Sequence, residues 1–253
     1  AVGVISSLII TYVNYIGIKP AAFLQGILTA VIIAIGLVLI AGSSVSGNLT
    51  YTEPLFNDGF GGILSVAVMT PFMFVGFDVI PQAAEEIAIP FKDIGKLIIL
   101  SIGSAVVWYA VIILSVSVMM TAPEIDSSVL VTADAIKKAY GGSELMAKLL
   151  IIGGMAGIVS SWNSFFMGGS RAIYALAKAR CLPEFLSVLH PRYKTPTNAI
   201  ILIGAISCIA PFFGRAMMVW LTNAGGTGAV TAYLMVSISF LVLRRKEPEL
   251  RRP

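Results

Sequence analysis

The sequence predicts an all-α polytopic membrane protein, and three observations lead to that prediction. The chain is 57% hydrophobic and only 12% charged, whereas a soluble domain carries about 25% charged residues. Its mean hydropathy is +0.92. Apolar runs that approach or reach the length needed to cross a hydrocarbon layer of ~30 Å recur along the chain. We therefore expect about seven transmembrane helices, one of them broken.

The expected spans form a single transmembrane domain over residues 1–253. The first run is short and lacks the Met, the basic stretch and the cleavage site of a signal peptide, so it is interpreted as part of a longer helix. We place the spans at about residues 1–16, 20–42, 62–81, 94–120, 147–178, 197–214 and 216–243.

A short amphipathic helix is expected over 131–140, between two spans. Val131, Ala135 and Ile136 alternate with Lys137 and Lys138 at helical spacing. The distribution of Lys and Arg residues places this segment on the outer side of the membrane. A lid over the outer mouth and a plain surface helix are both open interpretations.

The basic residues predict the orientation. Of the 17 Lys and Arg residues, all but four fall on the same side as Lys19. The four on the other side are Lys137, Lys138, Lys148 and Arg215. By the positive-inside rule the richer side is cytoplasmic, and the expected location is the plasma membrane. The sequence pI of about 9.1 then reflects these loops and contact with anionic lipid. It does not indicate nucleic-acid binding, because no soluble face gathers the basic residues.

The stretch TPFMFVGFDVIPQAAEE, residues 70–86, interrupts a span with helix breakers and an acid. Pro71 and Pro81 lack an amide donor, and Gly76 permits irregular backbone. Asp78 places a carboxyl where insertion costs roughly 3 kcal/mol. Irregular backbone at that depth is tolerated only inside protein or beside a watery cavity, and secondary transporters build midplane binding sites in this way. The alternative is a proline-kinked packing helix with a partly solvated Asp78.

The sequence offers no catalytic set and no metal-ligand set. His190 is the single histidine, and with two distant cysteines it cannot complete a tetrahedral zinc site. The GxSxG, HExxH and P-loop motifs are absent from the sequence. Glu85 and Glu86 are interpreted as solvated carboxylates of a cytoplasmic loop, not as an acid–base pair. We expect neither an enzyme nor a cofactor.

Three segments resemble a known family in their order and spacing. FMFVGFDVIPQAAEEIAIPFKDIGK resembles the sixth helix and following loop of amino acid permeases in the amino acid–polyamine–organocation (APC) superfamily. SSWNSFFMGGSRAIYALAKARCLPEFLSVLHPRYKTPTNAI is similar to the eighth helix and the loop after it, and WLTNAGGTGAVTAYLMVSISFLVLRRKEPELRRP to the tenth. The resemblance implies part of a five-plus-five inverted-repeat transporter fold, from the end of the fourth helix to just past the tenth. The first helix, which carries the opposing half of the family's binding site, would be missing.

The resemblance also implies roles for individual residues. Asp78 matches an acid implicated in proton coupling in some members. Adjacent Ser160 and Ser161 are weaker candidates for holding sodium, because hydroxyls that bond back to the helix backbone are commoner. No charged residue lies between Pro20 and Asn48, so the lysine that replaces sodium in some members has no counterpart. The implied substrate-binding residues are Phe72 and Phe165 as aromatic gates and Phe74, Val75 and Gly76 as the unwound turn; simple packing is the alternative for each phenylalanine.

The implied function is a secondary active transporter that imports amino acids across the cytoplasmic membrane by alternating access. The expected coupling ion is H⁺, because burial favours the protonated form of a carboxyl such as Asp78. The expected substrate is a neutral apolar amino acid, because the site would be lined by Phe72, Phe74, Phe77 and Phe165 with no basic residue beside them. The protein is expected to lie in a lipid bilayer, and its oligomeric state is open. The alternatives are a polyamine or amine transporter, an exchanger and a channel-like pore.

Overall fold

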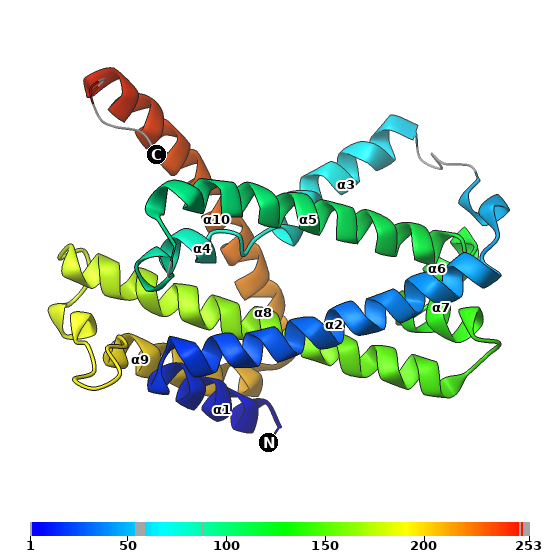
Figure 1. Cartoon of the computed structure of the whole chain (residues 1–253), viewed down its shortest axis with the longest axis horizontal. Coiled ribbons are helices and arrows are strands. Elements are labelled where there is room, and N and C mark those ends of the chain that lie inside the picture. Colours follow the sequence, from blue (N-terminus) through cyan, green and yellow to red (C-terminus); the bar gives the residue numbers. More distant parts are fainter. Residues whose placement is uncertain (1, 54–58, 88, 248, 250–253) are drawn as a thin grey trace. The chain divides into compact units, whose positions relative to one another are not determined.

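The computed structural model describes residues 2–53, 59–87, 89–247 and 249, and nearly all of them are helical or lie in short turns between helices (Figure 1). Some helical residues are described by their backbone alone: Val68, Met69, Pro71, Phe72, Arg215, Ala216, Met218, Val219 and Asn223. The prediction of an all-α chain is therefore confirmed over the described residues.

The chain divides into two compact units, which we describe separately. Unit 1 comprises residues 1–17, 78–97 and 168–253, and unit 2 comprises 18–77 and 98–167. Two long helices contribute residues to both units. These are α5 (Phe91–Ser117) and α8 (Glu144–Lys178).

Besides its parts of α5 and α8, unit 2 contains α2 (Ile18–Ser46), the 3₁₀ turn η1 (Leu49–Thr52), α3 (Gly59–Met73), α6 (Ala122–Ser127) and α7 (Val131–Ala139). Helix α2 is the first long span, and α7 is the amphipathic helix predicted over 131–140. Unit 1 contains α1 (Val2–Ile16), α4 (Val79–Gln82), η2 (Ala84–Glu86), η3 (Glu184–Ser187), α9 (Thr197–Ile209), η4 (Ala210–Phe213) and α10 (Gly214–Lys246).

Four helices in the described part of the chain are long and apolar enough to cross a membrane: α2, α5, α8 and α10. Helix α1 and the α9–η4 segment are apolar but shorter, and α3 has only 15 residues. A local feature marks the C-terminal end of each of them. Helix α1 ends before Gly17, α3 stops at the predicted break, and α9 runs into Pro211 and Gly214, whose φ is +66°. This composition fits a polytopic membrane protein.

Helix α7 packs on the end of α2 in unit 2. Ala135 and Ile136 are fully buried with Leu39 of α2. The Tyr140 hydroxyl donates to the Val38 carbonyl at 2.9 Å, and the Ser46 hydroxyl donates to the Ala139 carbonyl at 3.0 Å. The apolar face that the sequence showed at helical spacing is thus buried against a span.

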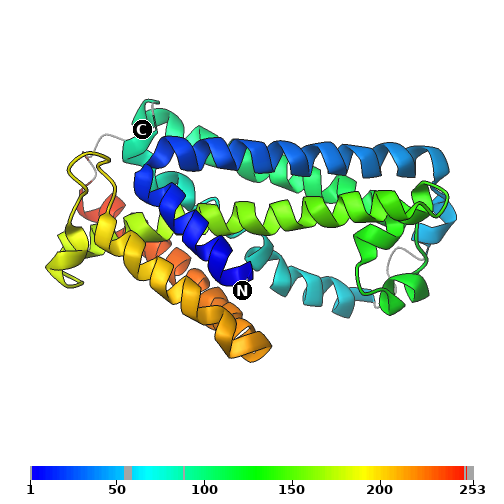
Figure 2. The ribbon, with the colours of Figure 1, turned by 90° about the horizontal axis from the view of Figure 1, so that it is seen from below.

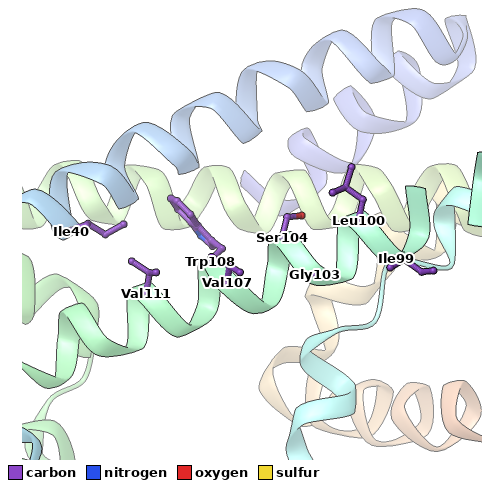
Figure 3. Close-up of a pocket in the computed structure, with 8 residues that line it drawn as sticks. All are labelled: Ile40, Ile99, Leu100, Gly103, Ser104, Val107, Trp108 and Val111. Carbon is purple, nitrogen blue, oxygen red and sulfur yellow. The ribbon is translucent and has the colours of Figure 1, made fainter. Parts of the chain in front are cut away.

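Helices α2 and α5 approach closely where Gly36 has no side chain. A Cβ at Gly36 would lie 2.4 Å from the Trp108 ring, so the indole occupies that space. Beside this contact a groove of about 600 Å³ runs between the two helices, with Ile40, Val111 and Trp108 on its walls (Figure 3). Its lining is almost entirely apolar, and it includes none of the residues that the sequence nominated for a site.

Helices α1 and α9 lie side by side in unit 1 (Figure 2). The Ser7 hydroxyl donates to the Ser207 carbonyl at 3.0 Å. A Cβ at Gly204 would lie only 2.6 Å from the Thr11 hydroxyl oxygen, so the small residue permits the contact. At the other end of α1, the Thr195 hydroxyl donates to the Tyr15 carbonyl at 2.9 Å.

Candidate functional site

The predicted break in the third apolar run is present. Helix α3 ends at Met73 and helix α4 begins at Val79, and residues 74–78 between them form turns. Gly76 has a φ of +127°, a backbone conformation that side-chain-bearing residues rarely adopt. The helix resumes with a hydrogen bond from the Gln82 amide to the Asp78 carbonyl at 3.3 Å. The prediction of a broken helix is therefore confirmed.

On the unit 2 side of the break, α5 supports the end of α3. The Tyr109 hydroxyl donates to the Met73 carbonyl at 3.2 Å, which satisfies one of the carbonyls that a helix end leaves without an intrahelical partner. The Tyr109 ring also meets the Phe74 ring edge-to-face, with centroids 5.5 Å apart. Neither contact was predicted, because the sequence gives no sign of which aromatic residue faces the break.

The phenylalanine and valine candidates are placed differently from one another. Phe74 and Val75 are half-buried in the turn, whereas Phe165 on α8 is 46% exposed in unit 2. Phe72 lies on α3, and its side chain is outside the described part of the structure. An aromatic enclosure by Phe72 and Phe165 therefore stays a prediction.

On the unit 1 side of the break, Asp78 is half-buried and held by two donors. The Gln82 side-chain amide donates to its Oδ2 at 3.0 Å, and the Tyr233 hydroxyl of α10 donates to its Oδ1 at 3.3 Å. Gln82 follows Asp78 by one helical turn, so its spacing could have suggested the bond. Tyr233 is 155 residues away, and nothing in its sequence neighbourhood points to Asp78.

Glu86 has a partner that the sequence did not indicate. Its carboxylate forms a two-armed ion pair with Arg171 of α8: Nε lies 2.8 Å from Oε1, and Nη2 lies 3.1 Å from Oε2. The Arg171 side chain is only 8% exposed, and that of Glu86 is 31% exposed. The exposed positions of Glu85 and Glu86 agree with solvated carboxylates, but the sequence did not indicate that α8 brings a buried guanidinium to Glu86.

Ser160 and Ser161 lie on different sides of α8. Ser160 is buried and accepts a hydrogen bond from the Gln25 side-chain amide at 2.6 Å, whereas Ser161 is exposed. Asn163, also buried, donates to the Ala21 carbonyl and to the Gln25 side-chain oxygen, both at 3.1 Å. These amides and the Ser160 hydroxyl join α2 to α8 within unit 2. In the described part of the chain, His, Cys, Asp and Glu residues form no group of three that could hold a metal ion.

The chain is similar to known proteins along its whole length. A family model described as amino acid permease matches residues 1–253. The chain belongs to the amino acid permease family. The resemblance to APC permeases drawn from the three motifs is thereby confirmed, and with it the expectations of an integral membrane protein and of a permease instead of an enzyme.

Several curated proteins are similar to this permease chain over nearly all of its length. It is 30% identical over 249 residues to the branched-chain amino acid permease BcaP of Bacillus subtilis (strain 168), covering 96% of this chain and 51% of that protein. It is 26% identical over 247 residues to the methylthioribose transporter of the same organism, covering 96% and 52%. It is 26% identical over 253 residues to the cationic amino acid transporter 7, chloroplastic, of Arabidopsis thaliana, covering 96% and 42%. The chain thus spans about half the length of the curated relatives it matches.

Proposed function

We propose that this chain works in a secondary active transporter that imports amino acids across the plasma membrane by alternating access. The observation that carries the proposal is the break at residues 74–78, within a chain that an amino acid permease model matches throughout. A non-helical turn at membrane depth has backbone groups outside the helical ladder, which can bind a polar ligand where lipid cannot. We assign the carbonyls around Phe74, Val75 and Gly76 to the substrate ammonium group. Phe72 and Phe165 would be the aromatic gates.

The proposed substrate is a neutral amino acid with an apolar side chain. Phe74 and Val75 supply apolar surface at the turn, and burial of each substrate methylene in such surroundings contributes about 0.8 kcal/mol. The relative named as a branched-chain amino acid permease supports this choice. The relatives named as cationic amino acid transporters support the alternative of a cationic amino acid or an amine, with Asp78 facing its charge.

The proposed coupling ion is the proton, carried by Asp78. The Asp78 carboxylate accepts hydrogen bonds from Gln82 and Tyr233, and a proton can bind one of these oxygens in place of its donor. For sodium, Ser160 would have to exchange the amide of Gln25 for a cation, and Ser161 lies on an exposed face. This geometry favours protons. We further propose that the loops rich in Lys and Arg lie in the cytoplasm.

Uptake by the full-length protein in proteoliposomes tests the function. We expect saturable uptake of labelled leucine or valine that a pH gradient drives, and displacement by unlabelled leucine, valine or alanine. Asp78→Asn should abolish the pH dependence. If arginine or putrescine displaces the label far better than leucine, the apolar pocket is wrong. If uptake does not saturate and shows no counterflow, a channel is the better description.

A further inference from the structure

The segment after the break meets α8 through two polar side chains, Gln82 and Glu86. Asp78 and Gln82 are one helical turn apart and hydrogen-bonded to each other, and Glu86 follows in the 3₁₀ turn η2 (Ala84–Glu86). Helix α4 itself has only four residues, Val79–Gln82, and so short a helix depends on tertiary contacts for its position. In unit 1 two of those contacts come from α8.

The first contact is a close approach at Gly168. A Cβ there would lie 2.1 Å from the Gln82 side-chain oxygen and 3.1 Å from a methyl carbon of Val79. The absence of a side chain at Gly168 thus leaves the space that the Gln82 amide occupies. The other end of the same amide donates to Asp78.

The second contact is the ion pair of Arg171 with Glu86, one helical turn further along α8. The guanidinium binds both carboxylate oxygens, and its Nη1 donates to the Ser170 hydroxyl at 2.9 Å. Such two-armed pairing fixes the direction of both side chains. Because Arg171 is buried, its charge strongly favours the arrangement in which Glu86 stays against it.

We propose that Arg171 is a positioning residue for Asp78. By its ion pair with Glu86 it holds α4 against α8, which keeps the Asp78 carboxylate beside Gln82 and Tyr233. This inference rests on the proposed role of Asp78 in proton coupling. It adds that Arg171 keeps Asp78 in place for that role, which no sequence motif indicated.

The Asp78 environment in unit 1 contains other titratable groups, and a pH profile must be read with them in mind. Tyr233 on α10 contacts Asp78, and the further titratable groups on the segment after α4 and on the unit 1 part of α8 are Glu85, Glu86, Arg171, Tyr174 and Lys178. Lys178 and Glu85 are exposed, so they provide charge-matched controls for Arg171 and Glu86.

The experiment compares Arg171→Lys and Glu86→Gln with Lys178→Gln and Glu85→Gln in the full-length protein. The first measurement is hydrogen exchange of the backbone amides of residues 79–86, except that of Pro81, which has no amide hydrogen. We expect exchange to rise about tenfold in Arg171→Lys and Glu86→Gln and to stay within about twofold in the controls, because local opening is governed by such contacts. The second measurement is the pH profile of uptake, whose midpoint should move in the same two variants and stay in place in the controls, because Asp78 would no longer be held beside Gln82 and Tyr233.

A charge swap, Arg171→Glu with Glu86→Arg, separates positioning from general damage. We expect it to recover at least part of the exchange protection that Arg171→Glu alone loses. Unchanged exchange in Arg171→Lys and Glu86→Gln would overturn the inference, as would faster exchange with an unmoved pH midpoint. Failure of the proposed function is recognised separately, since the wild-type protein would then show no saturable amino acid uptake.

Discussion

At the scale of single residues, polar side chains in this chain often replace backbone hydrogen bonds at loops and helix ends. His190 is an example in the loop between α8 and α9. Its Nδ1 accepts hydrogen bonds from the backbone amides of Arg192 and Tyr193, both at 3.1 Å. Its ring stacks on Tyr193 with centroids 4.7 Å apart and meets Tyr15 edge-to-face. The histidine thus organises a turn and ties it to α1, which explains its presence without any catalytic role.

We therefore expect His190→Asn to be tolerated better than His190→Ala. The asparagine oxygen can accept the same backbone amides, as it does in Asx turns, whereas alanine leaves them to water. Loss of such a cap costs about 1 kcal/mol. Thermal unfolding of the purified protein in detergent measures the difference. Equal melting temperatures for the two variants would show that the ring stacking, and not the Nδ1 acceptor, is what matters.

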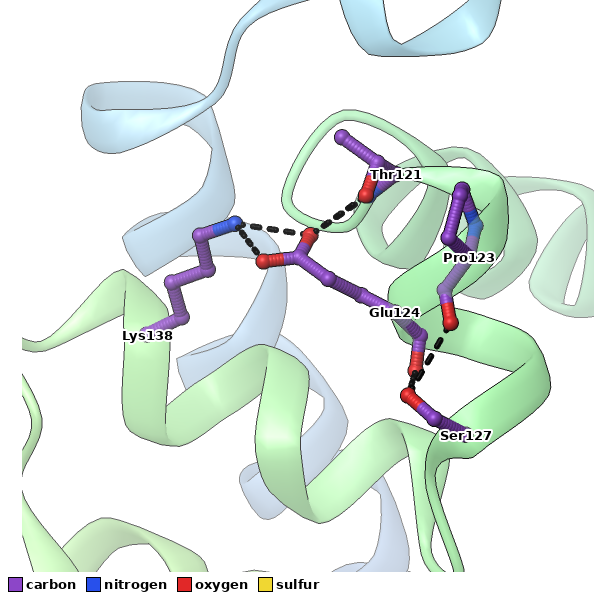
Figure 4. A network of polar contacts seen from close by, with 5 residues as sticks. All are labelled: Thr121, Pro123, Glu124, Ser127 and Lys138. Carbon is purple, nitrogen blue, oxygen red and sulfur yellow. Dashed lines mark hydrogen bonds and ion pairs between the residues drawn. The ribbon is translucent and has the colours of Figure 1, made fainter.

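At the scale of elements, the α6–α7 segment is held by a network centred on Glu124. Its carboxylate accepts from the Thr121 amide and hydroxyl at 2.7 and 3.0 Å, and Lys138 of α7 binds both carboxylate oxygens at 2.9 Å (Figure 4). Lys138 also lies over the Tyr51 ring, 5.0 Å from its centroid. The Lys138 ammonium, followed by the Thr121 donors, lowers the pKa of Glu124 to about 2. Sequence periodicity predicted α7, but it did not predict this connection to α6.

This network gives a pH dependence with a definite sign. A carboxyl whose pKa is depressed in the folded state stabilises that state above its unfolded value of 4.5, and the contribution is lost as pH falls toward about 2. We expect hydrogen exchange of the α6 and α7 amides to rise between pH 4.5 and 2 relative to that of α2. Glu124→Gln should show fast exchange already at neutral pH, with Asp126→Asn as the control. A flat pH response in the wild-type protein would contradict the assignment.

Helix α1 depends on a different kind of contact, in which a glycine admits a neighbouring side chain. Gly204→Ala should destabilise the protein by about 1–3 kcal/mol, because the new methyl group would overlap the β-branched Thr11 side chain. Thr11→Ala in the same protein should restore most of that loss, and a double-mutant cycle of thermal or denaturant unfolding measures the coupling. Additive effects would mean that α1 shifts freely against α9.

At the scale of the whole molecule, the chain is a set of membrane helices with extensive exposed apolar surface. Among the residues whose side chains the structure describes, the most apolar stretches of α5 and α10 contain no buried ones. Lipid, or further helices such as those of relatives about twice as long, can cover these surfaces. The same consideration applies to the break, since the resemblance to APC permeases implies that a further helix supplies the opposing half of the substrate site.

We therefore expect purified residues 1–253 alone to show no saturable amino acid binding. Isothermal titration or scintillation proximity measurements with leucine, in detergent and in nanodiscs, test this expectation, with the full-length protein as the positive control. Saturable binding by residues 1–253 would show that the turn at 74–78 makes a self-contained site.

The sequence by itself determined the class of protein, the family and the position of the break. Hydropathy identifies spans because lipid tolerates few charges. Gly76 marks the break through local backbone chemistry that needs no tertiary information, whereas Pro71 and Pro81 lie within α3 and α4 on either side of it. Only the tertiary structure decided which side chains meet. Three such contacts join residues far apart in the sequence: Tyr109 and Met73 are 36 positions apart, Arg171 and Glu86 are 85 apart, and Tyr233 and Asp78 are 155 apart. No periodicity encodes such pairings, because they depend on how helices are rotated and stacked against one another.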